Sequence, residues 1–191
     1  NIEHGKKIID RKLEPDKIVD FNKFLFLRDL KSEGSIKSRA IARSLVISWI
    51  EKKHGLLSGE FNSQVMATRV TLWCFSYSWF AESGESTFQS VLLQSIAFQT
   101  KYLELKLTEA NDNLEKIILI KGIIIGQSIL YEDLESIDNL IVLIDKALLH
   151  LINEDGGHIS RSPILQIELL RHLVEIRSVI AILKKVDAET L

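Results

Sequence analysis

Very little in this chain interrupts a helix, and this limits its possible folds more than any other feature. The only prolines are Pro15 and Pro163, and no segment shows sustained alternation of apolar and polar residues. Apolar residues recur instead at helical spacing, which predicts about seven helices. Their approximate ranges are 16–34, 35–55, 62–83, 86–103, 113–130, 133–153 and 163–180.

Residues at the expected helix starts support this pattern. Asn62 and Ser162 are favoured N-cap residues, Pro163 suits a first helical position, and Ser86 with Gln89 predicts a capping box. Short connections place consecutive helices antiparallel, so we expect an all-α fold of αα-hairpins that form a bundle, a solenoid or an arc of an α/α toroid. We place the helical domain at residues 16–185, between a flexible N-terminal segment, 1–15, and a tail, 186–191.

Composition argues against several classes of protein. The net charge of −2 gives no reason to expect a nucleic-acid partner. Cys74 is the only cysteine, which excludes an internal disulfide and a thiolate zinc cluster, and we expect no metal or cofactor. The apolar stretch Ile117–Leu130 is interrupted by Lys121 and is shorter than the roughly 20 residues of a membrane span, so we expect a buried helix and no membrane. No signal peptide is visible in residues 1–20, and the single cysteine fits a cytoplasmic or a periplasmic location.

The connection before the last helix is too rich in polar groups for a simple turn. Residues 154–163 read Glu-Asp-Gly-Gly-His-Ile-Ser-Arg-Ser-Pro. His158, Arg161 and the amide end of the following helix could together bind a carboxylate or a sulfate. Alternatively, Gly156 ends one helix, Ser162 caps the next, and His158 and Arg161 are solvated. These residues alone favour neither interpretation.

This loop resembles the signature of heparinase II/III-like proteins, bacterial proteins in which a helical toroid precedes a β-sandwich domain. Further segments between about residues 24 and 183 match family patterns in the same order. They are Phe26–Leu30 (similar to WLRDL), Ala42–Ile50 (ARxLVxxWI), Thr68–Trp73 (GRRxxxW), Gln99–Leu103 (QxxxL) and Leu119–Gly126 (LKGLxxAG). The resemblance implies an arc of an α/α toroid and a C-terminal β-sandwich domain in a parent protein.

The resemblance also implies a chemistry. Characterised lyases of this group cleave polysaccharides that contain uronic acids, such as glycosaminoglycans, by β-elimination. A base removes the proton α to the carboxylate, and a polar or cationic group stabilises the charge that develops. Here it implies an acidic polysaccharide or oligosaccharide as partner, His158 as the catalytic base, and Arg161 and Ser160 as substrate-binding residues.

Two helices offer further candidates for substrate binding. Arg69 lies one helical turn before Trp73, so Trp73 could stack on a sugar ring while Arg69 binds an acidic group, and Tyr77 extends this stripe. Gln99 and Tyr102 are polar positions on a largely apolar helix. All five residues also have a simpler interpretation as packing residues, and we expect His172 to be a packing or a surface residue.

One departure from the family pattern concerns proton transfer. The active lyases carry a Tyr-His pair shortly after the Ser-Pro of the signature, whereas Leu165 and Gln166 stand here. Leucine cannot transfer a proton, so we expect the chain to be inactive alone. It could instead be a non-catalytic acidic-glycan-binding or scaffold protein that keeps the toroid fold, or a helical interaction module whose loop is only a corner. An incomplete toroid would expose apolar helix faces, so we also expect possible self-association.

Overall fold

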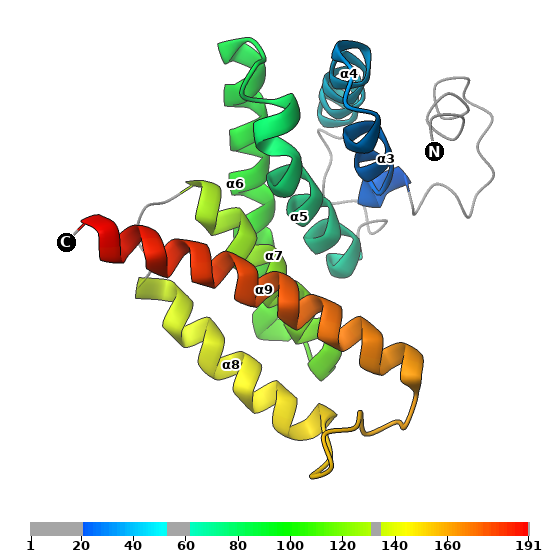
Figure 1. Ribbon diagram of the computed structural model, residues 1–191, viewed down its shortest axis with the longest axis vertical. Coiled ribbons are helices and arrows are strands. Elements are labelled where there is room, and N and C mark those ends of the chain that lie inside the picture. Colours follow the sequence, from blue (N-terminus) through cyan, green and yellow to red (C-terminus); the bar gives the residue numbers. More distant parts are fainter. Residues whose placement is uncertain (1–20, 53–61, 131–134, 191) are drawn as a thin grey trace. The chain divides into compact units, whose positions relative to one another are not determined.

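The computed structural model describes residues 21–52, 62–130 and 135–190, and all its named elements are helices (Figure 1). The chain divides between Gln99 and Thr100 into two compact units. Within the described residues, the β-type pairing is limited to one isolated antiparallel bridge between Ile152 and His158. The expectation of an all-α fold is therefore confirmed.

The first unit is built around a cluster of aromatic rings. It contains α3 (Phe26–Glu33), α4 (Ile36–Lys52), α5 (Ser63–Phe80) and the start of α6 (Ser86–Glu109), and α3 packs against both α4 and α5. Phe24, Trp49 and Trp73 meet edge to face, with ring centroids 5.1–5.9 Å apart. Such large rings bury more apolar surface than aliphatic side chains, so they dominate the packing of these helices.

The helix that we expected to run as far as Gly34 is interrupted at Phe24 and Leu25. Residues 21–23 are helical, Phe24 then has a φ of 61°, and α3 begins at Phe26. A positive φ is strained for a residue with a side chain. The Phe24 ring is fully buried against the two tryptophans, and this packing offsets the strain.

The second unit is organised around α7 (Asn113–Leu130), which begins and ends where the sequence predicted. It also contains the rest of α6, α8 (Glu135–Leu151) and α9 (Pro163–Thr190), and α7 packs against both α8 and α9. Residues 117–126 of α7 are all buried. At Gly126 a Cβ atom would lie only 2.2 Å from Oγ1 of Thr100, so glycine is required for the close approach of α6 and α7.

The three helix starts expected from capping residues are confirmed, because α5, α6 and α9 begin at Ser63, Ser86 and Pro163. Oδ1 of Asn62 accepts a hydrogen bond from the backbone N–H of Gln64 at 2.7 Å, and α9 begins at Pro163 directly after Ser162. The capping box predicted at Ser86 is wrong, because Ser86 is the first helical residue of α6 and not its N-cap, and Nε2 of Gln89 donates to the carbonyls of Glu82 and Gly84. The side-chain amide of Gln89 therefore stabilises the turn that precedes α6.

The helical domain was expected to begin at residue 16 and to end at residue 185. The boundary at residue 15 falls outside the described residues, whereas α9 continues to Thr190, so residues 186–190 of the expected tail are helical. Over the ranges given above, no helix is long and apolar enough to cross a membrane.

Candidate functional site

The connection between α8 and α9 folds back on itself. The backbone N–H of Ile159 donates to the carbonyl of Leu151 at 2.8 Å, and that of Asn153 donates to the carbonyl of Gly157 at 2.9 Å. Gly156, with a φ of 81°, allows the chain to reverse between these bonds. The segment is therefore an ordered loop, which we call the signature loop (residues 152–162).

His158 lies inside the signature loop and is 5% exposed. The backbone N–H of Ser160 donates to Nδ1 of His158 at 3.1 Å, and Oγ of Ser160 lies 2.7 Å from the same nitrogen. Because Nδ1 accepts an N–H bond, the neutral imidazole carries its proton on Nε2. Nε2 is buried without a hydrogen-bond partner among the described residues. In this orientation Nε2 can donate a hydrogen bond but cannot accept a proton, so a role as base would require the ring to turn.

Gln166 is a loop-fixing residue that the sequence analysis did not recognise. Its Oε1 accepts a hydrogen bond from the backbone N–H of His158 at 2.5 Å, and its Nε2 lies 3.5 Å from the carbonyl of Gly156. The first turn of α9 is thus fastened to the loop. The resemblance implies the histidine of the Tyr-His pair at this position, whereas Gln166 holds the loop backbone.

Arg161 and Asp155 form an ion pair on the outside of the signature loop. The Nη1–Oδ2 distance is 2.5 Å, and 63% and 57% of the two side chains remain exposed. This pair and the N–H of Gly157, which donates to Oδ1, hold the pKa of Asp155 below its ordinary value. Arg161 has a φ of 54°, and a Cβ on Gly157 would lie 3.1 Å from its Nη1. The guanidinium therefore lies on the surface of the loop, paired with Asp155 and largely open to solvent.

Arg69, Trp73 and Gln99 come together in the core of the first unit, and all three are fully buried. Nε of Arg69 donates to Oε1 of Gln99 at 2.7 Å, Nη1 donates to the carbonyl of Asn22 at 3.0 Å, and the guanidinium lies 4.1 Å from the ring centroid of Trp49. Burial lowers the pKa of Arg69 to about 9. In this fold Trp73 exposes no ring face on which a sugar could stack.

The two tyrosine candidates are half-buried. Tyr77 follows Trp73 on α5, and burial together with the charge of Glu82 raises its pKa. Tyr102 belongs to the second unit, where Nζ of Lys106 lies 5.6 Å from its ring centroid. The structure thus brings together a buried set in the first unit (Arg69, Trp73, Gln99) and a signature-loop set in the second (His158, Ser160, Arg161), and the two tyrosines belong to neither set.

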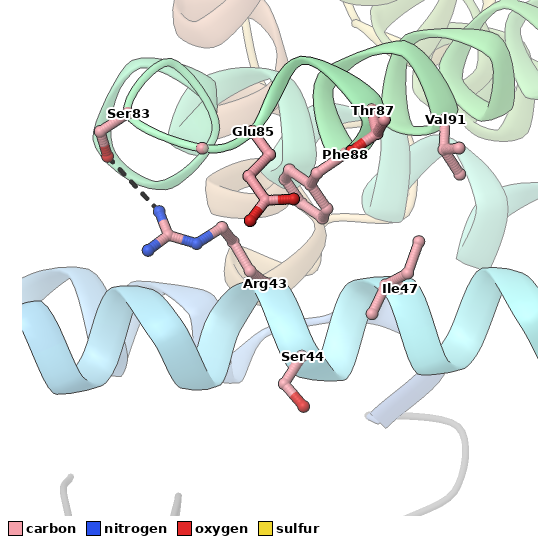
Figure 2. Close-up of a pocket in the computed structure, with 9 residues that line it drawn as sticks. Arg43, Ser44, Ile47, Ser83, Glu85, Thr87, Phe88 and Val91 are labelled. Carbon is pink, nitrogen blue, oxygen red and sulfur yellow. Dashed lines mark hydrogen bonds between the residues drawn. The ribbon is translucent and has the colours of Figure 1, made fainter.

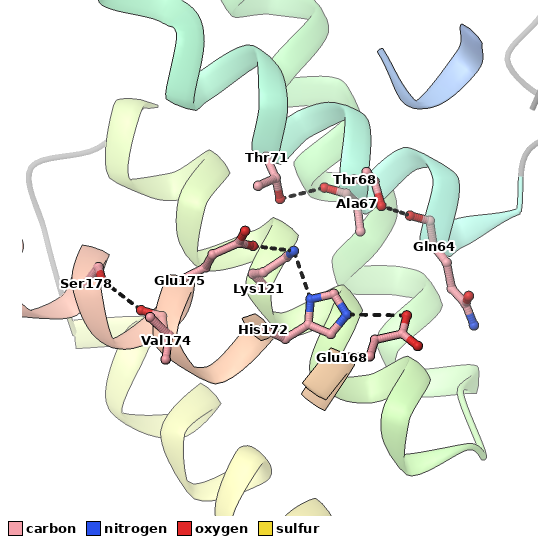
Figure 3. Close-up of polar contacts among 10 residues, drawn as sticks. All are labelled: Gln64, Ala67, Thr68, Thr71, Lys121, Glu168, His172, Val174, Glu175 and Ser178. Carbon is pink, nitrogen blue, oxygen red and sulfur yellow. Dashed lines mark hydrogen bonds and ion pairs between the residues drawn. The ribbon is translucent and has the colours of Figure 1, made fainter. Parts of the chain in front are cut away.

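A buried polar cluster joins α7 to α9 and was also missed from the sequence (Figure 3). Nζ of Lys121, which is 4% exposed, lies 3.0 Å from Nδ1 of His172 and donates to Oε2 of Glu175 at 2.8 Å. Burial, and then the charge of Lys121, lowers the pKa of His172 to about 4. His172 is therefore neutral and accepts from the lysine ammonium. The available sequence signal was a lysine within the apolar run of α7.

The first unit also carries an open groove of about 550 Å³ between α4 and the turn from α5 to α6. Arg43 points from α4 toward this turn, where its Nη1 donates to the carbonyl of Phe80 at 2.9 Å and to Oγ of Ser83 at 3.4 Å (Figure 2). Glu85 and Phe88 line the same groove. Because Arg43 is bound to the α5 end, its first role is to fasten α4 to α5.

Among the described residues, no three acidic, histidine or cysteine side chains come together as ligands for a metal ion. Comparison of the chain with protein-family models, curated proteins and solved structures gives no match. The resemblance to heparinase II/III-like proteins consequently rests on the residues quoted above.

Proposed function

We propose that this chain is a helical domain, of the α/α toroid type, from a heparinase II/III-like protein, and that it binds an acidic glycan without cleaving it. The observation that carries the proposal is the position of Arg161. Its backbone conformation and its partner Asp155 hold the guanidinium exposed, in the segment that resembles the family signature.

Arg161 suits a carboxylate or sulfate ligand because a guanidinium offers several N–H donors in a planar fork. The ion pair with Asp155 uses Nη1 and leaves more than half of the arginine side chain exposed. A sugar carboxylate would bind beside Asp155 or replace it. Since Asp155 stays ionised to unusually low pH, it competes with the ligand across the physiological range.

The geometry argues against proton transfer by the chain alone. Nε2 of His158 is enclosed and carries the proton in the neutral ring, and Leu165 offers no proton-transfer group. Gln166 is engaged with the loop backbone. Binding is therefore the activity that these residues support, and cleavage would require groups from a further domain.

Calorimetric titration with acidic oligosaccharides from heparin and alginate tests the binding. We expect Arg161→Ala to weaken binding about tenfold or more, as for a lost charge-assisted hydrogen bond. Asp155→Asn should strengthen it several-fold, because the competing charge is removed while an amide oxygen can still accept from Gly157. Arg177→Ala, which removes an exposed arginine of α9 outside the signature loop, is the control. No binding by the wild type, or equal binding by Arg161→Ala, would overturn the proposal.

Incubation with heparan sulfate, alginate and hyaluronan tests the absence of cleavage. We expect no rise in the ultraviolet absorbance of the unsaturated uronate that β-elimination produces. A rise that depends on the chain and disappears in His158→Ala would show that the chain is a lyase by itself.

A second candidate function, protein interaction, is favoured by apolar side chains on the surface of the second unit. Leu149 of α8 and Ile164 of α9 are 80% and 77% exposed.

A further inference from the structure

We propose that the groove of the first unit binds a small zwitterion with an apolar side chain, that is, an apolar α-amino acid such as leucine or phenylalanine. The groove has a volume of about 550 Å³, and all of its lining residues belong to the first unit. Pockets for small molecules typically measure roughly 300–1,000 Å³, so this groove has a suitable size. Glycan binding at Arg161, in the second unit, is independent of it.

One side of the groove is apolar and is fixed by packing. It is formed by Ile47 of α4 and by Phe88 and Val91 of α6, all of which are half-buried. The ring of Phe88 packs edge to face against the buried Phe80, with ring centroids 5.9 Å apart. A ligand side chain that covers these residues removes apolar surface from water on both partners, which favours binding.

Gly84 brings the apolar and the charged parts of the groove together. A Cβ atom at this position would lie 3.2 Å from Cδ1 of Phe88 and 3.3 Å from Cδ of Arg43. Both distances are shorter than an ordinary contact between carbon atoms, so the absence of a side chain lets Phe88 and Arg43 lie against the same turn. An aromatic ring and a charged side chain are therefore neighbours in this groove.

Two side chains of opposite charge line the groove without pairing with each other. Figure 2 shows Arg43 extending from α4 and Glu85 from the start of α6 into the space between the two helices. In the described part of the chain the carboxylate of Glu85 makes no hydrogen bond or ion pair, and Arg43 uses only Nη1, for Phe80 and Ser83. Nε and Nη2 of Arg43 remain as donors for a ligand.

The two unpaired charges determine which kind of ligand fits. A ligand with only a carboxylate is attracted by Arg43 but repelled by Glu85, and for a ligand with only an amine the two effects are reversed. A zwitterion presents a carboxylate to Arg43 and an ammonium group to Glu85, so both contacts are charge-assisted. An α-amino acid carries both groups on one carbon atom, which leaves its side chain to cover Phe88.

Titration of the whole chain with L-phenylalanine, followed through the amide signals in NMR spectra, tests the binding. We expect the amide signals of Gly84, Glu85 and Phe88 to shift in a saturable manner. Phenylpropionate lacks the ammonium group and phenethylamine lacks the carboxylate, but both keep the aromatic ring. Each should bind about tenfold more weakly than the amino acid, because it loses one charge-assisted contact and keeps one repulsion.

Two variants of neighbouring glutamates test the assigned position. Glu85→Gln keeps the size of the side chain but removes its charge, so it should weaken binding of L-phenylalanine about tenfold. Glu82→Gln changes an exposed glutamate of the same turn that does not line the groove, and it should bind like the wild type. Circular dichroism confirms that both variants are folded. A wild type without saturable shifts, analogues that bind as tightly as the amino acid, or equal affinities of the two variants would overturn the proposal.

Discussion

Substitutions at Gly156 can measure the energetic cost of a left-handed backbone conformation separately from any steric clash. Its φ is 81°, and an added Cβ would meet no atom within 4 Å, so a side chain there has space but a strained backbone. We expect Gly156→Ala to lower the free energy of unfolding by about 1 kcal/mol. Gly156→Asn should recover most of this loss, because asparagine tolerates the left-handed region. Urea denaturation measures both, and equal losses for Ala and Asn would mean that the backbone conformation is not the cause.

Gly126 represents the opposite case, in which space is the constraint. A Cβ there would lie 2.2 Å from Oγ1 of Thr100, inside the contact of α6 with α7. We expect Gly126→Ala to lower the free energy of unfolding by roughly 1–3 kcal/mol through overpacking. Thr100→Ala removes the clashing hydroxyl, so the double variant should regain part of the loss. A simple sum of the two single effects would argue against a direct clash.

The contact between α7 and α9 should make stability depend on pH through His172. Its pKa is about 4 in the fold, where burial and then the charges of Lys121 and Arg171 oppose its protonation and Glu175 favours it, against about 6.5 in the unfolded chain. The unfolded chain binds this proton more readily, so the stabilisation is complete above about pH 6.5 and is lost as the pH falls toward 4. The total loss is at most about 3–4 kcal/mol, because one pKa unit corresponds to about 1.4 kcal/mol.

The variant His172→Gln isolates this effect from other titrating groups. Its side-chain oxygen can still accept from the ammonium of Lys121, but it does not titrate. We expect the free energy of unfolding of this variant to fall less steeply than that of the wild type between pH 6.5 and 4. Identical slopes for the two proteins would show that His172 does not report on the α7–α9 contact.

Elements with local signals were predictable from the sequence, and those determined by distant contacts were not. The apolar run of α7 and the caps at Asn62 and Ser162 predicted helices where the structure has them. The break at Phe24 was missed because it depends on two tryptophans that lie 25 or more residues away. Gln89 was assigned to the wrong partner because its hydrogen bonds run back to the preceding turn.

The features of the candidate site also divide into those that local sequence predicted and those that depend on distant contacts. The order of residues in the signature loop identified an unusual connection, and the structure shows it to be closed by its own hydrogen bonds. Spacing on α5 correctly placed Arg69 and Trp73 on one side of the helix, but it could not show that this side is buried. The contact of Lys121 with His172 joins residues 51 positions apart, so no local sequence pattern predicts it.

The charge of the whole molecule predicts how glycan binding responds to salt. With a net charge of −2, the chain has no overall attraction for an acidic glycan, and the proposed site has one exposed guanidinium. Screening should therefore act on about one ion pair, so a tenfold increase in salt should weaken binding by about tenfold or less. Titrations at several salt concentrations give this dependence. Asp155→Asn should change the affinity but should not make its dependence on salt steeper. A loss of more than 100-fold would instead indicate a broad basic surface and move the glycan site away from Arg161.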